Sequence, residues 1–174
     1  TLTLAGCAGQ SMMQDISGPS AQELLQQANT QSGQQAAASR LEAADILARQ
    51  GDTAQALQIA SQIDSTQLDS TQRIRWAMVL SDSALAEEDG QRVIRATDIL
   101  DSTTELSTGD RQTLRYRRGL ALNMIGEPEA AARLLIGLQR DNAPYELNDD
   151  IWKPLSSLSP TALNALAATD GDPV

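Results

Sequence analysis

The sequence has no histidine and no phenylalanine, and it holds a single cysteine, Cys7, and a single lysine, Lys153. Without histidine the chain cannot form a Ser-His-Asp or Cys-His catalytic site, or a histidine-rich zinc site. One cysteine cannot close an intramolecular disulfide, so cysteine usage alone does not reveal the redox compartment. These absences exclude several classes of hydrolase and metalloenzyme.

Aromatic residues make up 2% of the chain, whereas hydrophobic residues make up 41%. The core must therefore consist of alanine, leucine, isoleucine and valine, and such small and straight-chain residues favour close packing between helices. The formal net charge is −10. A chain this acidic repels phosphate backbones and offers no basic patch to anionic lipids, so we expect no nucleic-acid partner.

Acidic residues cluster at Glu87-Glu88-Asp89 and at Asp149-Asp150, where they could suggest a metal site or acid–base chemistry. Neither cluster has the D-x-D-x-D-G spacing of a calcium loop, and carboxylates near helix ends usually face the helix dipole or solvent. No glycine-rich loop ending in lysine follows a strand pattern, so no phosphate-binding loop is expected. We therefore expect a protein that is not an enzyme and has no metal site or small-molecule cofactor.

The single cysteine lies in the tetrad Leu4-Ala5-Gly6-Cys7, which resembles the lipobox of bacterial lipoproteins. Thr1 to Gly6 matches the end of a secretory signal, and it is too short to span a bilayer. The resemblance implies that Cys7 carries the lipid anchor and that Ala8, which is not aspartate, directs the protein to the outer membrane. The alternative is a fortuitous cysteine in a flexible leader. We assign residues 1–20 to the signal end, the lipidated cysteine and a flexible tether.

Residues 21–174 show helical periodicity and no alternating strand pattern, which predicts an all-α domain. Glycine, proline and the capping pattern Ser107-x-x-Asp110 mark the helix boundaries. The predicted helices cover about Ser20–Asn29, Gln34–Gln50, a segment with Ala56, Ile59, Ala60 and Ile63, Ser70–Glu88, Gln91–Leu100, Ser107–Ile125, a segment from Pro128 with Ala131, Leu134, Leu135 and Leu138, a short helix with Trp152, and Pro160–Leu166.

These helices repeat in pairs. LARQGDTAQALQIA aligns without gaps on LNMIGEPEAAARLL, and ALAEEDGQRVIRATDIL fits between them with one extra residue. The alignment makes Gly51, Gly90 and Gly126 the turn residues, followed by Ala56, Ala96 and Ala131, and it puts Ala44, approximately Ser83, and Gly119 at the small position of the first helices. The period resembles tetratricopeptide repeats. This resemblance predicts a tetratricopeptide-like solenoid of antiparallel helix pairs.

Two groups of residues are candidates for binding a partner. Arg111, Arg115 and Arg118 share one helical face, which could dock an acidic partner or a glycan-linked carboxylate, although ion pairs with neighbouring helices explain them more simply. In the tetratricopeptide alignment the inner, concave face carries Asp45, Arg49, Tyr116 and Asn123, and for Tyr116 core packing is an equal explanation.

The two tryptophans, Trp76 and Trp152, are expected to be packing anchors rather than ligand platforms. Trp152 belongs to the stretch NDDIWKPLSSLSPTALNAL. Pro154, two residues later, removes a helical hydrogen bond and should kink the short helix.

That stretch resembles the N-W-x-x-L-S-S-(L/M)-(S/T) segment that closes the amino-terminal helical domain of the LpoA family, outer-membrane lipoproteins that activate penicillin-binding proteins. The matching residues are Asn148, Trp152, Leu155, Ser156, Ser157, Leu158 and Ser159. The resemblance implies that the chain is the amino-terminal part of a longer protein. It implies a lipid-anchored regulator of peptidoglycan synthesis whose partner is a class A penicillin-binding protein. In this family a second domain carries much of the synthase contact.

The resemblance gives this domain the role of periplasm-spanning spacer and docking module, on the periplasmic side of the outer membrane. Only Cys7 matches a functional residue of the family. The alternative is a generic periplasmic tetratricopeptide lipoprotein that scaffolds envelope protein assembly. A peptidoglycan hydrolase that uses a lone carboxylate is a third possibility, which the sequence opposes because no acid and partner group can be identified.

Overall fold

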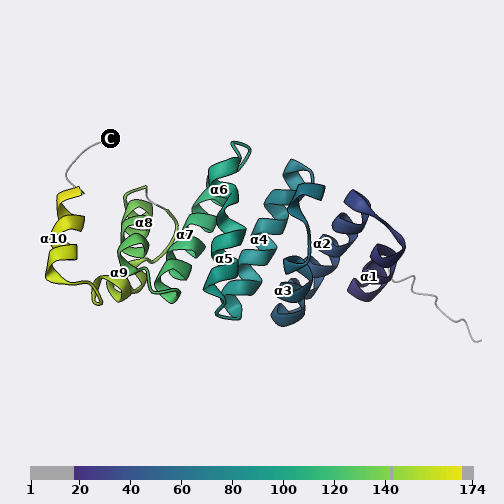
Figure 1. The fold of residues 1–174 in the computed structure, drawn as a ribbon, viewed down its shortest axis with the longest axis horizontal. Helices are drawn as coiled ribbons and strands as arrows, with labels where there is room; N and C mark the ends of the chain where they lie inside the picture. The colour runs from purple at the N-terminus through teal and green to yellow at the C-terminus, as the bar shows by residue number, and fades with distance from the viewer. Residues whose placement is uncertain (1–17, 142, 170–174) are drawn as a thin grey trace, which may run out of the picture.

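The computed structural model describes residues 18–141 and 143–169, and within these ranges every regular element is helical. The all-α class predicted from the sequence is therefore confirmed. Figure 1 shows the helices standing side by side in one row that follows the order of the chain. The elements are α1 (Ala21–Thr30), α2 (Gly33–Arg49), α3 (Thr53–Ser61), the 3-10 helix η1 (Ser65–Gln67), α4 (Ser70–Ala86), α5 (Gly90–Thr97), α6 (Ile99–Ser102), α7 (Thr108–Met124), α8 (Pro128–Arg140), α9 (Asn148–Leu155) and α10 (Pro160–Thr169).

Helices that are neighbours in the chain are also neighbours in space. The closest packing joins α1 to α2, α2 to α3, α4 to α5, and α7 to α8. In addition α2 contacts α4 and α4 contacts α7, so the first helices of three successive pairs lie side by side. This arrangement places α2, α4 and α7 along one side of the row. The assignment to tetratricopeptide repeats stays a prediction.

The turn between paired helices contains a residue in the left-handed backbone region. Gly51 and Gly126 have φ angles of +84° and +82°, as their role as turn residues requires. Between α4 and α5, however, this residue is Glu88, with a φ angle of +56°. Gly90, predicted as the turn glycine, is the first residue of α5, and a β-carbon there would lie 2.8 Å from Ile125 Cγ2. The central repeat therefore begins two residues earlier than the glycine alignment places it.

This shift changes which residues occupy the small positions of the central repeat. Val93 bonds to the N-cap residue of α5 as Ala56 and Ala131 bond to theirs, so Val93 replaces Ala96 in the alignment. The same shift makes Ser81, rather than Ser83, the counterpart of Ala44 and Gly119, although both serines are fully buried.

Gly119 is required by the close approach of α7 and α8. A β-carbon at this position would lie 2.7 Å from Leu135 Cδ2 and 2.8 Å from Leu135 Cγ, and Leu135 itself is fully buried. Any side chain larger than hydrogen would push the two helices apart. The small residue predicted here therefore sets the spacing between these helices.

The capping box predicted at Ser107 forms only in part. Ser107 Oγ accepts a hydrogen bond from Asp110 N at 3.1 Å. The Asp110 carboxylate, however, accepts from the Ser107 hydroxyl and not from the Ser107 backbone N–H. At α1 the longer Glu23 side chain reaches the backbone N–H of Ser20 at 2.7 Å and completes the box. The missing methylene of aspartate explains the difference.

The fifth predicted helix is interrupted. It ends at Thr97, and the short helix α6 follows from Ile99. A tight turn at Asp98, in which Asp101 N bonds to Asp98 O at 3.2 Å, shifts the register so that Ile99 is buried. Leu100, the predicted last residue of that helix, is only half-buried.

The hydrophobic core is divided. One large cluster joins α2 to α7, and it includes Leu41, Leu80 and Leu114. A smaller cluster contains Leu135, Leu138, Leu147 and Ile151 and joins α8 to α9. The large cluster includes fully buried alanines, which let the helices approach closely: Ala44, Ala60, Ala77, Ala84, Ala96 and Ala121.

Candidate functional site

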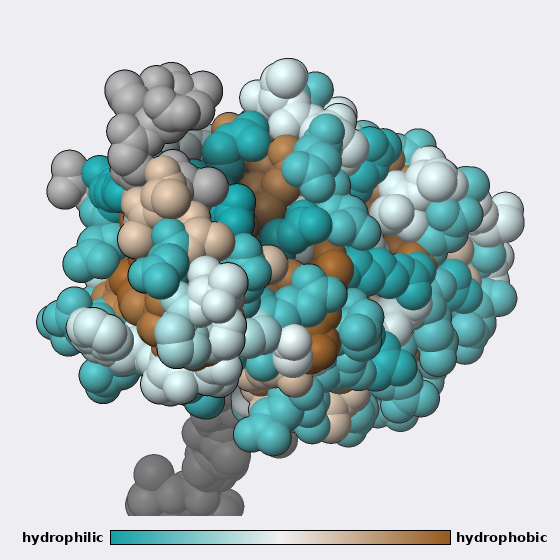
Figure 2. Space-filling view, turned by 60° about the vertical axis from the view of Figure 1, so that its left-hand side comes forward, coloured by the Kyte–Doolittle hydropathy of each residue, from teal (hydrophilic) through white to brown (hydrophobic). Residues whose placement is uncertain are grey.

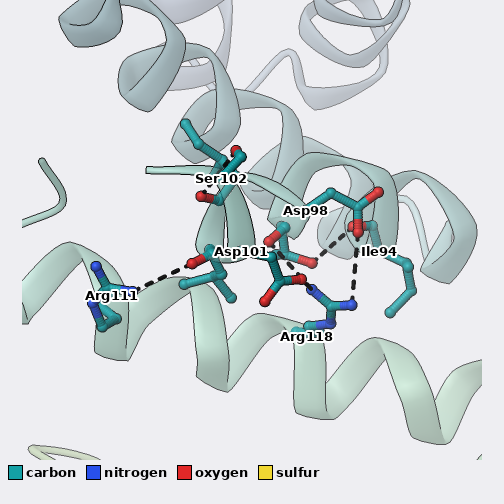
Figure 3. A network of polar contacts seen from close by, with 9 residues as sticks. Ile94, Asp98, Asp101, Ser102, Arg111 and Arg118 are labelled. Atoms are coloured by element: carbon teal, nitrogen blue, oxygen red, sulfur yellow. Dashed lines mark hydrogen bonds and ion pairs between the residues drawn. The ribbon is translucent and has the colours of Figure 1, made fainter. Parts of the chain in front are cut away.

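The predicted arginine face of α7, formed by Arg111, Arg115 and Arg118, lies against α6 and α8. Figure 3 shows Arg111 and Arg118 extending from α7 towards the end of α5 and α6. Arg111 donates hydrogen bonds to Leu100 O at 3.4 Å and to Thr103 O at 3.3 Å. Carbonyls at the end of a helix lack partners within it, so the guanidinium supplies the donors that they need.

The other two residues of the arginine face form ion pairs. Arg118 lies 3.6 Å from Asp98 and 3.4 Å from Asp101, and Arg115 lies 2.9 Å from Asp141. The carboxylates are the exposed partners, with 64%, 78% and 53% of their side chains accessible. Such surface pairs contribute little to stability, about 0–1 kcal/mol each. Ion pairing with neighbouring helices, the simpler of the two interpretations, thus accounts for these contacts.

Beside the arginine face lies an open cleft between α7 and α8. It consists of two hollows, of 360 Å³ and 780 Å³, that share Arg115 and Leu134. Leu122, Leu134 and Leu158 provide apolar walls, and Arg133 and Glu129 form an ion pair at 3.0 Å on the rim. Figure 2 shows hydrophobic surface lying in the hollows between helices at this end of the molecule, between hydrophilic ridges. We call this feature the α7–α8 cleft.

Asp45 and Arg49, predicted on the concave face, lie together on α2. Asp45 forms ion pairs with Arg49 and with Arg75 of α4. Asp45 and Arg49 line a groove of 250 Å³ that extends over α4 to Arg117 of α7. This groove follows the side of the row on which α2, α4 and α7 are neighbours.

Arg117 connects α7 to α4, a role that the sequence analysis did not assign to it. Its Nη1 donates hydrogen bonds to Met78 O at 2.8 Å and to Ser81 Oγ at 2.9 Å, and it also pairs with Asp82. The sequence shows only that Arg117 lies off the helical face that Arg111, Arg115 and Arg118 share. That position indicates a different contact, but not which helix Arg117 reaches.

Tyr116 contacts α9 and the loop that precedes it. Its hydroxyl donates a hydrogen bond to Asp150 Oδ2 at 2.8 Å, and its ring stacks on Tyr145 with centroids 4.4 Å apart. Tyr145 in turn shares a hydrogen bond of 2.9 Å with Thr113. Burial, followed by the hydrogen bond and the charge of Asp150, raises the pKa of Tyr116 to about 12. Core packing, the alternative considered for Tyr116, describes these contacts.

Asn123, also predicted on the concave face, lines a separate hollow of 230 Å³ with Met124, Asp150 and Lys153. The structure therefore does not bring the predicted residues into one site. Arg111 and Arg115 border the α7–α8 cleft, Asp45 and Arg49 border the groove over α2, and Tyr116 and Asn123 lie near α9. Their roles in binding stay predictions.

The two tryptophans differ. Trp76 is 5% exposed and its indole Nε1 donates to Ala60 O at 2.9 Å, as expected of a packing anchor. The same expectation is wrong for Trp152, whose residue is 68% exposed. Ile151 and Pro154 occupy the buried positions of the eight-residue helix α9, and Trp152 therefore points outwards. Pro154 lies within α9, one residue before the helix ends at Leu155, and it has no N–H to donate to Asp150 O four residues earlier.

Two further predictions concern the lipid anchor and metal binding. Cys7 lies outside the described residues. In the described part of the chain, no helix has the length and apolar character needed to cross a membrane. Among the same residues, no group of three or more histidine, cysteine, aspartate or glutamate side chains could hold a metal ion.

The chain was compared with known protein families and structures. The model of the LppC lipoprotein family matches residues 15–173, nearly the whole chain. No curated protein and no solved structure matches the chain. The family match agrees with the LpoA-type resemblance seen in the sequence, and it implies a membrane-anchored lipoprotein. The chain belongs to the LppC lipoprotein family.

Proposed function

We propose that this domain is a non-catalytic module of an outer-membrane lipoprotein that regulates, as an activator, peptidoglycan synthesis by a class A penicillin-binding protein. The family match over residues 15–173 carries this proposal. The LpoA-like stretch around Trp152 supports it, because this stretch resembles the activator family specifically. Cys7 is the proposed lipid attachment site, which would hold the domain on the periplasmic side of the outer membrane.

The arrangement of the helices supports a role as spacer and docking module. We propose that the row is a tetratricopeptide-like solenoid, in which each helix pair contacts its neighbours and successive pairs extend the molecule in one direction. Figure 1 shows such an extension from α1 to α10. An extended row of helices can bridge distance between two envelope structures and can offer long grooves to another protein.

The contacts of the charged residues favour binding over catalysis. Arg115, Arg117 and Arg118 each pair with a carboxylate, and the Tyr116 hydroxyl donates to Asp150. The pKa of Tyr116 is raised to about 12, away from the range useful to a general acid or base near neutral pH. We therefore propose that the domain is not an enzyme and that it needs no cofactor.

The α7–α8 cleft is the proposed docking surface for the synthase. It combines apolar walls with Arg115 and Arg133 at its edge, and its larger hollow of 780 Å³ can accept side chains of another protein. The ion pairs at its rim are exposed, so a partner carboxylate can replace Asp141 at Arg115 at little cost.

The second candidate function is a scaffold for envelope protein assembly. The groove bordered by Asp45, Arg49 and Arg117 favours it, because it follows the side of the row on which repeat proteins of this kind commonly bind extended peptides. This groove is smaller, at 250 Å³, and its charged residues are paired with one another.

The experiment that tests these proposals measures peptidoglycan cross-linking by a cognate class A synthase with and without the purified chain. The activator proposal expects greater cross-linking with the chain, and it expects Arg115→Ala to reduce the effect. Arg92→Ala is the matched control, because Arg92 pairs with Asp89, the N-cap residue of its own helix, and does not line the cleft.

No change in cross-linking together with no binding to the synthase would contradict the role assigned to this domain. Stimulation that Arg115→Ala leaves intact would instead contradict the docking surface. The scaffold proposal expects peptide binding that is lost in Arg49→Ala.

A further inference from the structure

A polar hollow lies between the start of α2 and the segment that follows α3, near the opposite end of the row from the α7–α8 cleft. Its volume is 510 Å³, within the range of small-ligand sites. The α1–α2 turn, the first two turns of α2 and the loop that leads into η1 form its walls. The polar residues that line it are Gln31, Ser32, Arg40, Gln62, Asp64 and Gln67.

Arg40 and Arg95 are the two arginines without a protein partner in the described part of the chain, and of these two only Arg40 lines the hollow. Within residues 18–141 and 143–169, seven arginines pair with a carboxylate: Arg49, Arg75, Arg92, Arg115, Arg117, Arg118 and Arg133. Arg40 is half-buried, lines the hollow, and has no hydrogen bond or ion pair with any described residue. Its guanidinium has five donors that no described protein group accepts, so a ligand in the hollow can bind them in place of water.

The nearest carboxylate of the hollow is already engaged. Asp64 accepts hydrogen bonds from Thr66 N at 3.0 Å and from Thr66 Oγ1 at 2.7 Å, which turn it towards its own loop. Gln31 is held as well, because its Oε1 accepts from Ser39 Oγ at 2.8 Å. The walls are therefore ordered by contacts within the protein, while the Arg40 donors remain available.

The chemistry of the hollow specifies the ligand. A guanidinium binds a carboxylate with two parallel hydrogen bonds. Glutamine side chains both donate and accept, as a peptide group does, whereas a phosphate could use only their donors. Ala36, Ala37 and Ile63 form a buried apolar part of the wall that can receive a small side chain. We propose that this Arg40 hollow binds the C-terminal carboxylate of a peptide that ends in small residues.

This inference does not depend on the proposed synthase partner. The test is an NMR titration of the purified chain with acetylated Ala-Ala, compared with the same dipeptide carrying a C-terminal amide. We expect saturable shifts of Gly33, Arg40 and the glutamine side-chain amides with the acid, and weaker binding of the amide. Arg40→Ala should weaken binding of the acid about tenfold or more, because the charge-assisted hydrogen bonds to the carboxylate are lost.

Two variants keep the test specific. Arg95→Ala is the matched control, because Arg95 is exposed on α5, likewise without a described partner, and does not line the hollow. Arg40→Lys keeps the charge but loses the planar fork, so it should bind more weakly than the native chain and more tightly than Arg40→Ala. The same titration with D-Ala-D-Ala shows whether the hollow prefers the C-terminus of a protein, made of L-residues, or a peptide of D-residues. Saturable binding of either isomer supports the proposal.

Three results would overturn the proposal. The first is the absence of saturable binding of both isomers at millimolar concentrations. The second is equal binding of the acid and the amide, since the carboxylate would then not be recognised. The third is equal binding by Arg40→Ala and the native chain. A far-UV circular dichroism spectrum of each variant establishes that it is folded, and the cross-linking assay is not needed for any of these results.

Discussion

The central helices α2–α7 and the C-terminal helices α8–α10 are held together in different ways. The central part has one continuous hydrophobic cluster in which alanines such as Ala44, Ala60 and Ala77 are fully buried. The C-terminal part has a smaller cluster, a loop tyrosine, Tyr145, that stacks on Tyr116 of α7, and two large apolar residues left at the surface, Trp152 and Leu163. Small residues let many helix contacts merge into one core, whereas fewer and larger side chains produce a local core with open surface beside it.

The largest expected difference between the two parts comes from the same substitution made in each. Leu80→Ala in the central cluster removes a side chain that is 1% exposed, and it should lower the free energy of unfolding by about 2–5 kcal/mol. Leu163→Ala on α10 changes a residue that is 38% exposed, and it should cost less than about 1 kcal/mol. Urea denaturation followed by circular dichroism measures both. Equal losses would mean that the two parts are packed alike.

A smaller loss of unfolding free energy is expected when the polar contacts of Arg117 between α4 and α7 are removed. Arg117→Met keeps the apolar stem but removes the donors to Met78 O and Ser81 Oγ, so the free energy of unfolding should fall by about 1–3 kcal/mol. Asp82→Ala removes only the partner that is 58% exposed, and it should cost at most about 1 kcal/mol. If the two variants lose the same free energy of unfolding, then the ion pair, and not the hydrogen bonds to Met78 O and Ser81 Oγ, stabilises the contact between α4 and α7.

Substitutions at two equivalent turns between paired helices should change the stability in opposite directions. Gly126→Ala, at the entry to α8, should destabilise the chain by about 1–2 kcal/mol because φ is +82°. Glu88→Gly, at the equivalent turn in the central part, should stabilise it by up to about 1 kcal/mol, because a strained residue is replaced by one that adopts φ of +56° readily. Thermal unfolding of the two variants checks the signs. A loss in both would show that the Glu88 side chain contributes more than the strain.

Glu88 does contact its neighbourhood through the backbone, since its N–H bonds to Leu85 O at 3.1 Å. A glycine keeps this backbone bond. Glu88→Ala, which keeps the β-carbon but removes the carboxylate, is therefore the control that separates side-chain contacts from backbone strain.

The smallest effect is expected at the boundary between the two parts. Asp150→Ala should lower the pKa of Tyr116 from about 12 towards 10, but only in part, because burial is the largest cause of the shift and remains. Asp149→Ala, next to it on the exposed side of α9, should leave the pKa unchanged. The ultraviolet absorbance of tyrosinate measures this, with Tyr145→Phe to isolate the Tyr116 signal. An unchanged pKa in Asp150→Ala would contradict the hydrogen bond.

The raised pKa of Tyr116 also has a consequence for stability. The unfolded chain loses the tyrosine proton near the ordinary pKa of 10.0, and the folded chain holds it until about 12. The stability that Tyr116 contributes is therefore complete below pH 10, and it is lost as the pH rises from 10 to 12. Tyr116→Phe should show a weaker fall in stability over this range.

The helices could be predicted from the sequence because their signals are local. The cap at Ser107, the glycine turns at Gly51 and Gly126, and the apolar spacing of α8 each act within a few residues. The central turn escaped prediction because Glu88, which nothing in a single sequence marks as left-handed, takes the role that glycine usually has. The alignment used the nearby Gly90 as the turn residue instead. Gly90 is needed because the Ile125 side chain approaches it closely, and it does not form the turn.

The candidate surfaces were harder to predict, because they depend on which helices meet. The spacing of Arg111, Arg115 and Arg118 correctly placed them on one face, but the carbonyls and carboxylates that they contact come from other elements. Trp152 was misjudged for a related reason, since its burial depends on how α9 is turned against α8. Arg40 gave no signal in the sequence, because its lack of a partner is visible only when the neighbouring loop is in place.

The contrasting environments of the two tryptophans give the molecule a pair of built-in fluorescent reporters. Trp76 is enclosed in the central core and Trp152 is in contact with water, so their emission spectra should differ, with the buried indole at shorter wavelength. Trp76→Phe and Trp152→Phe would leave one emitter in each part of the row. An experimenter could then follow the loosening of the central helices and the arrival of a ligand near α9 as separate optical signals, without attaching a dye.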